Sequence, residues 1–281
     1  MPGILFVVGT PIGNLGDITR RAVETLTLVD RVVAEDTRRT RALLSHLGIT
    51  GKPIECIDAN APLSRMQKVV ELLSAGQRVA LVTDAGMPGI SDPGSRLVTA
   101  ATDAGVEIQV VPGPSSVTAA LALSGLVEGP FHFLGFLPRQ GKRRRAALEK
   151  LARTSEPVVL FESPQRVKTT LRELALLQPE RAAVICRELT KLHEEVRRGT
   201  LLHLSDTLAE TRGEFVIVLG AHGGNEVEEE RPTLPDEVLL ERLQAGESPR
   251  TILEDLGVAG KERRELYSRL LTLADTIDPE P

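Results

Sequence analysis

The sequence of 281 residues has no tryptophan, one tyrosine and six phenylalanines. So few aromatic side chains argue against a base-stacking platform for single-stranded nucleic acid. The two cysteines, Cys56 and Cys186, lie 130 residues apart, and the five histidines show no metal-ligand spacing. We therefore predict no metal site, and two free thiols that fit a reducing cytoplasm.

Long hydrophobic runs are also missing. No apolar run approaches the roughly 18 residues that a membrane span requires. The start, "MPGILFVVGTPIG", lacks the basic segment of a signal peptide, so it predicts a first strand. Hydrophobic residues still make up 41% of the chain, which is enough for real cores, and the length suits two domains.

The formal charge of −5 would normally argue against a nucleic-acid partner, but it is unevenly distributed. Residues 1–220 hold 27 basic and 24 acidic side chains, a net charge of +3. Residues 233–281 hold six basic and eleven acidic ones. The acidity therefore belongs to the C-terminal tail, and the charge of the larger part is compatible with RNA.

Apolar runs of strand length alternate with amphipathic helical patterns through the first 220 residues. We predict an α/β fold with ligands at the carboxyl ends of strands. We predict that the turn "VVPGPSS" joins two α/β lobes, 1–113 and 114–222, and that an acidic linker, 223–232, and a small helical domain, 233–281, follow. The predicted strands are Ile4–Val8, Arg31–Ala34, Arg78–Val82, Val106–Val111, Phe131–Phe136, Val158–Glu162, Ala182–Arg187 and Phe215–Leu219.

Four loops share one pattern, in which a strand is followed by Gly, Pro, Ser, Thr or Asp and then by a helix. They are "GTPIGNLGDIT", "TDAGMPGISDPG", "PGPSSVTAAL" and "FESPQRV". Backbone amides and helix N-termini in such loops can face a ligand. The sequence contains neither a Walker loop nor the dinucleotide motif G-x-G-x-x-G. Together the loops favour a nucleotide-like ligand that is not held mainly by its phosphates.

Eight motifs in order, from residue 3 to about 220, closely resemble the family of ribosomal RNA small-subunit methyltransferase I. They are the four loops above with "AEDTRRTRALLSHLGI", "FLPRQGKRRRAAL", "RELTKLHEE" and "GEFVIVLG". The resemblance implies the tetrapyrrole methylase fold, two α/β lobes with S-adenosyl-L-methionine in the cleft between them. It also implies methylation of a cytidine ribose 2′-hydroxyl in the decoding region of 16S ribosomal RNA, by a cytoplasmic homodimer.

The resemblance further implies which residues bind the cofactor. Its ribose hydroxyls, ammonium and sulfonium suit a carboxylate and backbone groups better than a phosphate cradle. For Asp92, in "SDPGS", we favour the role of a helix cap. The implied cofactor-binding residues are Thr10, Asp84, Gly86, Met87, Ser115, Ser116, Glu162 and Leu189.

Methyl transfer is an in-line displacement in which alignment supplies much of the acceleration. A sugar hydroxyl is a poor nucleophile at neutral pH, so a nearby base or a lowered pKa would help. We predict Asp36, Arg38 and Lys191 as catalytic, although Asp36 could instead cap the helix after it and Lys191 could be a surface lysine. The sequence does not identify the base among Glu35, Asp36, Lys191, His193 and Glu194.

The segment "PRQGKRRRAALEKLAR" is the candidate RNA contact. Residues 139–153 contain seven basic side chains and one Glu. Such a run can be an ordinary solvated helix face, but it also suits salt-dependent binding of phosphates. We predict that Arg39, Lys142, Arg143, Arg144 and Arg145 bind RNA.

Two other functions remain open at this point. A relative in the superfamily could methylate a tetrapyrrole or another small molecule, but the basic segments would then have no use. A non-catalytic RNA-binding protein of ribosome assembly could have kept the fold, but the complete set of cofactor loops argues against it.

Overall fold

The computed structural model describes residues 3–58, 61–222, 234–256 and 260–277. The chain divides into two compact units, Met1–Gly223 and Gly224–Pro281, which are described separately. The linker expected at 223–232 lies outside the described residues.

The first unit contains two sheets, and the first of them is entirely parallel. Its strand order is β3-β2-β4-β1-β5. Side chains alternate between its two faces, as the pleat requires, so that Leu5 and Phe6 enter different cores. The strands are β1 (Ile4–Val8), β2 (Arg31–Ala34), β3 (Ile54–Cys56), β4 (Arg78–Leu81) and β5 (Glu107–Val111).

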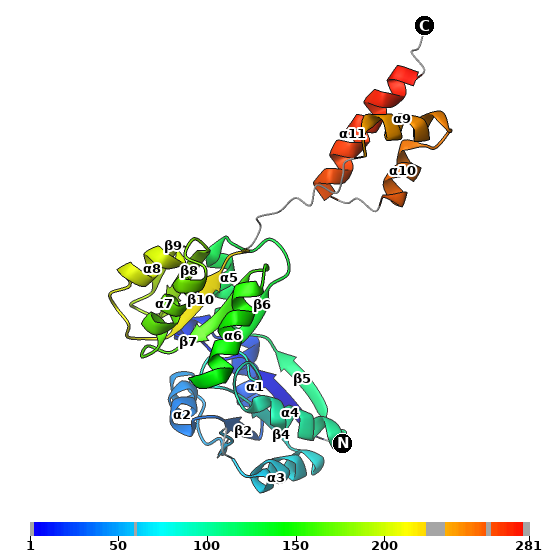
Figure 1. Ribbon diagram of the computed structural model, residues 1–281. Coiled ribbons are helices and arrows are strands. Elements are labelled where there is room, and N and C mark those ends of the chain that lie inside the picture. Colours follow the sequence, from blue (N-terminus) through cyan, green and yellow to red (C-terminus); the bar gives the residue numbers. More distant parts are fainter. Residues whose placement is uncertain (1–2, 59–60, 223–233, 257–259, 278–281) are drawn as a thin grey trace. The chain divides into compact units, whose positions relative to one another are not determined.

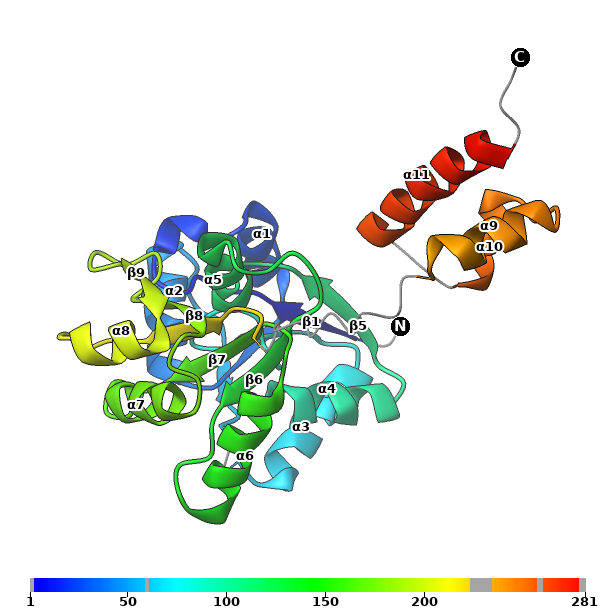
Figure 2. The same cartoon turned by 45° about the horizontal axis from the view of Figure 1, so that its top comes forward.

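Four helices cover this sheet, two on each face (Figures 1 and 2). Leu26 and Leu44 of the first two helices pack with Phe6, and Leu73 and Leu97 of the other two pack with Leu5. A short 3₁₀ helix, η1 (Leu15–Asp17), precedes the first. The helices are α1 (Arg20–Leu28), α2 (Thr37–His46), α3 (Leu63–Ser74) and α4 (Gly94–Asp103).

The neighbouring strands β1 and β4 send their connections to opposite faces of the sheet. The chain runs from β1 into α1 on one face and from β4 into α4 on the other. In open α/β sheets such a switch point leaves a crevice at the carboxyl ends of the strands, where ligands bind. The functional site is therefore expected beyond Val8 and Leu81.

The second sheet is mixed, with the order β6-β7-β10-β8-β9. Only the β6–β7 pair is parallel, and the other three pairs are antiparallel. The strands are β6 (His132–Phe136), β7 (Val158–Glu162), β8 (Ala182–Arg187), β9 (Glu195–Thr200) and β10 (Phe215–Leu219).

Helices also cover both faces of the second sheet. One face packs against α6 (Gly141–Arg153), α7 (Val167–Leu177) and α8 (Leu201–Thr207). The other packs against α5 (Ser116–Ser124) and also against Ile12, which comes from the loop after β1. A residue that follows a strand of the first sheet thus lies in the core of the second sheet.

The α/β architecture predicted from the sequence is confirmed, and all eight predicted strands are present within one residue at each end. Two strands were missed, β3 and β9. Asp36 is the N-cap of α2, the role that the sequence left open as an alternative to catalysis, because its Oδ1 accepts the Arg38 N–H at 2.8 Å.

The C-terminal unit consists of three helices around a small core of its own. Leu239, Ile252, Leu253 and Leu270 are fully or almost fully buried there. The helices are α9 (Asp236–Gln244), α10 (Pro249–Asp255) and α11 (Gly260–Ile277). Across the described residues of both units, no helix combines the length and apolar character of a membrane span.

Candidate active site

The crevice beyond the parallel sheet contains a cavity of about 410 Å³. Ligand pockets typically measure roughly 300–1,000 Å³. Seven of the eight residues predicted to bind a cofactor line this cavity, and Thr10 lines the smaller cavity beside it. The seven are Asp84, Gly86, Met87, Ser115, Ser116, Glu162 and Leu189.

Thr10 joins the loops that follow β1 and β4. Its backbone exchanges two hydrogen bonds with Gly86, at 2.9 and 3.1 Å, and its hydroxyl donates to the Thr83 carbonyl at 3.1 Å. Gly86 has φ of +83°, a conformation that side chains with a Cβ adopt only with strain. These bonds fix the positions of the two loops at the switch point.

Asp84 lies where this pair of loops meets the start of α2. Its Oδ1 accepts the Asp36 N–H at 3.2 Å, and its Oδ2 lies 3.5 Å from Nη1 of Arg39. The carboxylate is therefore oriented by two groups and still borders both cavities.

Phe136 and Phe161 form an aromatic wall of the larger cavity. Their ring centroids lie 5.5 Å apart, and Phe161 contacts Phe133 edge-on at 5.0 Å. Sequence reasoning missed both wall residues, since it treated the six phenylalanines only as a shortage. Phe136 begins the motif "FLPRQGKRRRAAL" and Phe161 begins "FESPQRV", and these positions were the available signal.

Glu162 contributes a buried carboxylate whose oxygens are already engaged within the protein. One oxygen accepts the Thr170 hydroxyl at 2.6 Å, and the other accepts the Ser163 N–H at 2.7 Å and pairs with Arg166 at 2.6 Å. Glu162 therefore orients Thr170, Ser163 and Arg166 at the cavity wall, and these partners offset the cost of burying its carboxylate.

Ser115 and Ser116 begin helix α5 at the cavity. Ser115 is the N-cap residue, but its side chain makes no capping hydrogen bond. The first backbone amides of a helix are unsatisfied within the helix itself and favour anionic groups. This end of the cavity thus presents hydrogen-bond donors, namely amides and hydroxyls. Elsewhere in the cavity the carboxylates of Glu35 and Asp84 present acceptors.

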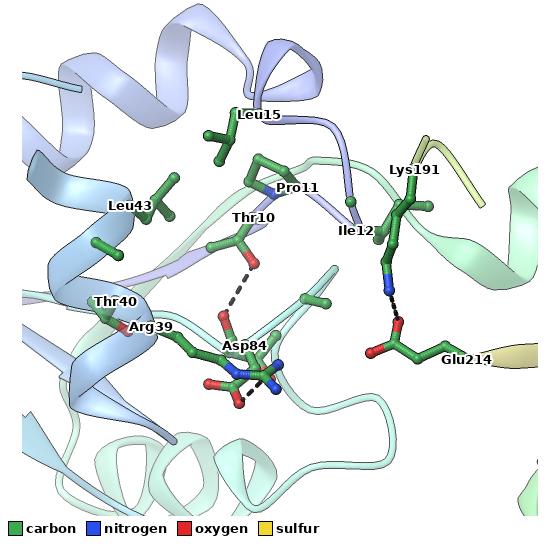
Figure 3. Close-up of a pocket in the computed structure, with 14 residues that line it drawn as sticks. Thr10, Pro11, Ile12, Leu15, Arg39, Thr40, Leu43, Asp84, Lys191 and Glu214 are labelled. Atoms are coloured by element: carbon green, nitrogen blue, oxygen red, sulfur yellow. Dashed lines mark hydrogen bonds and ion pairs between the residues drawn. The ribbon is translucent and has the colours of Figure 1, made fainter. Parts of the chain in front are cut away.

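A second cavity of about 320 Å³ adjoins the first (Figure 3). Its apolar walls include Pro11, Leu15 and Leu43, and two cations, Arg39 and Lys191, also line it. Six residues line both cavities and form a shared wall between them. They are Ile12, Arg39, Thr83, Asp84, Ala85 and Glu214.

Lys191 reaches this cavity from the loop between β8 and β9. Its Nζ donates to Glu188 at 2.8 Å and to Glu214 at 2.9 Å. Burial lowers the pKa of Lys191, but these two hydrogen bonds outweigh burial and raise the pKa above the ordinary lysine value. Lys191 is therefore a fixed cation and not a base. Glu214 was missed by sequence reasoning, although it lies in the motif "GEFVIVLG".

The loop that carries Lys191 stores backbone strain. Glu188 has φ of +52° and Thr190 has φ of +64°. Non-glycine residues with positive φ cost roughly 1–3 kcal/mol each and persist only where surrounding contacts hold them. The Asn14 N–H donates to the Thr190 hydroxyl at 2.9 Å, which ties this loop to the first lobe.

Asp36 and Arg38, two of the residues predicted to be catalytic, line neither of the two cavities. Asp36 caps α2, and Arg38, whose side chain is 86% exposed, pairs with it at 2.9 Å. Hydrogen bonds from Arg38 lower the pKa of Asp36 to about 2, so it is a weak base. Arg39 is the arginine that reaches the cavities, because it lies on the same face of α2 as Leu43.

The other titratable candidates differ in their surroundings. Burial raises the pKa of Glu35, against the hydrogen bond that Thr83 donates to it at 3.2 Å, and Glu35 lines the larger cavity. Glu194 accepts the Thr190 N–H at 2.5 Å and so braces the loop. Asp92 accepts the N–H groups of Gly89 and Gly94 at 2.7–2.9 Å, which orders the turn before α4.

The basic segment forms helix α6, and its four consecutive cations do not behave alike. Lys142, Arg143 and Arg145 are exposed, and none of them forms an ion pair within the described residues. Arg144 is buried. It pairs with Glu173 and donates to the Thr170 hydroxyl at 2.8 Å and the Pro138 carbonyl at 3.1 Å. Its guanidinium is thus engaged inside the protein, unlike the three exposed cations, and RNA binding by Arg144 stays a prediction that its burial argues against.

No group of three or more His, Cys, Asp and Glu side chains suited to a metal ion occurs in the described part of the chain.

The sequence is similar to those of known methyltransferases. Residues 5–205 match the family described as Tetrapyrrole (Corrin/Porphyrin) Methylases. Ribosomal RNA small subunit methyltransferase I of Synechocystis sp. is 41% identical over 282 residues, covering 96% of this chain and 98% of that protein. The protein of the same name from Thermotoga maritima is 45% identical over 219 residues, covering 77% and 98%.

A solved structure gives the same result for the fold. Uroporphyrin III C-methyl transferase from Thermus thermophilus superposes with a TM-score of 0.57 at 18% identity, covering 78% of this chain and 97% of the other. At that identity the likeness establishes the fold alone.

Proposed function

Because this chain belongs to the family of ribosomal RNA small subunit methyltransferase I, within the tetrapyrrole methylases, we propose that it 2′-O-methylates a cytidine of 16S ribosomal RNA. The chain is an S-adenosylmethionine-dependent ribosomal RNA methyltransferase by this relationship. The ribose 2′-hydroxyl, the cytidine and its place in the decoding region are the finer part of the proposal.

The two adjoining cavities are the observation that supports this function best. A transferase must hold donor and acceptor so that the reacting atoms almost touch. The larger cavity would hold the methyl donor and the smaller one the acceptor nucleoside, with transfer at the wall that contains Asp84.

The residues of the larger cavity fit S-adenosylmethionine. The wall of Phe136 and Phe161 suits an adenine ring, the amides at the start of α5 suit a carboxylate, and Asp84 suits cationic groups. When bound, this cofactor supplies the electrophilic methyl group on its sulfonium.

The chain's own contribution to the reaction is position and charge. Lys191 stays protonated beside the smaller cavity, and Arg39 lies on the shared wall. Both cations are paired with carboxylates, Lys191 with Glu188 and Glu214 and Arg39 with Asp84. They would therefore offer an acceptor oxygen N–H donors held in place, with a largely compensated charge. The apolar side chains of Leu15 and Leu43 would contact the sugar.

RNA would be held mainly through its phosphates. The exposed Lys142, Arg143 and Arg145 lie on one helix, and Arg39 lies at the shared wall of the cavities. Phosphate contacts position a nucleic acid without reading its sequence. A cytoplasmic homodimer remains part of the proposal, and sedimentation analysis of the purified protein tests the dimer.

The decisive experiment uses small ribosomal subunits from a strain that lacks its own enzyme. The protein and labelled S-adenosylmethionine are added, and nucleosides are then separated by mass. We expect 2′-O-methylcytidine, and the Asp84→Ala variant should produce none. A methylated base, or methyl transfer to a porphyrinoid but not to the subunits, would refute the proposal.

A further inference from the structure

Leu192 is an apolar side chain left almost wholly in water, in the loop that contributes Lys191 to the smaller cavity. It is 93% exposed, and it directly follows Lys191, which lines that cavity. Scattered exposed leucines are ordinary on protein surfaces. This one differs in its location and in the rigidity of the loop that carries it.

Hydrogen bonds hold the loop from Glu188 to Glu194 on both sides of Leu192, at Glu188, Thr190, Lys191 and Glu194. The Lys191 N–H donates to the Glu188 carbonyl at 3.0 Å, and the Glu194 N–H donates to the Lys191 carbonyl at 3.1 Å. The Glu194 carboxylate in turn accepts the Thr190 N–H. Together these bonds hold the two positive-φ residues in place.

The same loop is packed tightly against the first lobe at Gly13. A Cβ at Gly13 would lie 2.5 Å from Cγ of Lys191 and 2.7 Å from the Thr190 hydroxyl oxygen. These contacts fix Thr190 and Lys191, the two residues before Leu192, before any substrate binds.

If the proposed function holds, the acceptor is a nucleotide in a structured RNA, and a nucleotide must leave its stack to enter a cavity. Unstacking costs a few kcal/mol, and apolar side chains that insert between bases recover part of it. Leu192 has the required chemistry, since it lacks polar groups and its apolar surface gains by leaving water.

We propose that Leu192 inserts against the bases that flank the target nucleotide and occupies the space that this nucleotide vacates. The residue would thus be a specificity determinant for structured RNA. This inference depends on the proposed function only for the identity of the acceptor.

The test compares Leu192→Ala and Leu192→Met with Leu176→Ala, which removes an 85% exposed leucine from α7. Single-turnover methylation of small ribosomal subunits is measured at saturating cofactor, with cofactor affinity measured separately. We expect Leu192→Ala to react about tenfold more slowly. Leu192→Met should stay within about twofold of the unmodified protein, since it keeps an apolar side chain of similar size. Leu176→Ala should be unaffected, and cofactor affinity should be unchanged in all three.

A second measurement detects the contact without requiring turnover. A benzophenone amino acid placed at position 192, with position 176 as its control, should crosslink to ribosomal RNA near the methylated nucleotide. If the unmodified protein methylates subunits while Leu192→Ala is equally fast and position 192 does not crosslink, this inference alone is refuted. If the unmodified protein neither methylates subunits nor crosslinks to them from position 192, the proposed function is refuted as well.

Discussion

Replacing Arg144 with methionine should destabilise the fold without weakening the electrostatic attraction for RNA. Replacing Arg143 with methionine should weaken that attraction without destabilising the fold. The two arginines are neighbours on α6, but only Arg144 is buried, with 7% of its surface exposed. Its guanidinium joins the Glu173 carboxylate, the Thr170 hydroxyl and the Pro138 carbonyl.

The magnitude follows from what remains after the substitution. Breaking a buried ion pair by removing one partner costs roughly 3–5 kcal/mol. The Glu173 side chain is 34% exposed, so water can replace part of the lost interaction. Methionine also fills most of the vacated volume. We therefore expect a loss of about 2 kcal/mol, the scale of hydrogen bonds to charged groups, which lowers the melting temperature by roughly 4–8 °C in a unit of this size.

Calorimetric unfolding measures the stability of each variant, and titration of RNA affinity against salt measures the charge contacts. Arg143→Met should melt as the unmodified protein does but lose about 0.7–0.9 from the slope of log affinity against log salt. Arg144→Met should keep that slope at temperatures where it is folded. Equal melting temperatures for the two variants, or a reduced salt slope for Arg144→Met, would contradict the assignment of Arg144 to the interior.

Three further substitutions address the site. Gly13→Ala should reduce turnover and leave cofactor affinity intact, since its Cβ would displace Lys191; normal turnover would show that the loop yields freely. Asp84→Ala should abolish binding of S-adenosylmethionine in calorimetry, and unchanged affinity would remove Asp84 from the site. Hydrogen bonding lowers the pKa of Asp36 to about 2 in the folded protein, so its stabilising effect is complete above the unfolded pKa and disappears as pH falls towards 2. The stability difference between Asp36→Asn and the unmodified protein should shrink over that range in urea titrations, and a constant difference would count against this pairing.

The strands that sequence patterns predicted are those with continuous apolar runs, which buried strands require. The two that were missed lack this signal. β3 (Ile54–Cys56) has only three residues, and β9 (Glu195–Thr200), "EVRRGT", is polar because it is an edge strand that pairs only with β8. Pairing with a neighbour, which no local pattern encodes, makes both of them strands.

In the site, too, local sequence patterns predicted the elements better than the direction of single side chains. Motifs predicted which loops form the cavities, because parallel strands bring their carboxyl ends together. They did not predict which cation of a run faces inward. Helix periodicity contained part of that answer, since Arg144, Leu148 and Leu151 share the buried face of α6 at spacings of four and three. The choice of Arg39 over Arg38 likewise depends on how α2 lies against the sheet.

The distribution of aromatic residues has a spectroscopic consequence. Tyr267, in α11, is the only tyrosine, the chain has no tryptophan, and all six phenylalanines lie in the first unit. Intrinsic tyrosine fluorescence therefore reports on the C-terminal helical unit alone and is blind to unfolding of the catalytic unit. The absence of tryptophan emission is useful, because a Phe136→Trp substitution would place the protein's single indole at the wall of the larger cavity. Its emission would then report directly on what enters that cavity.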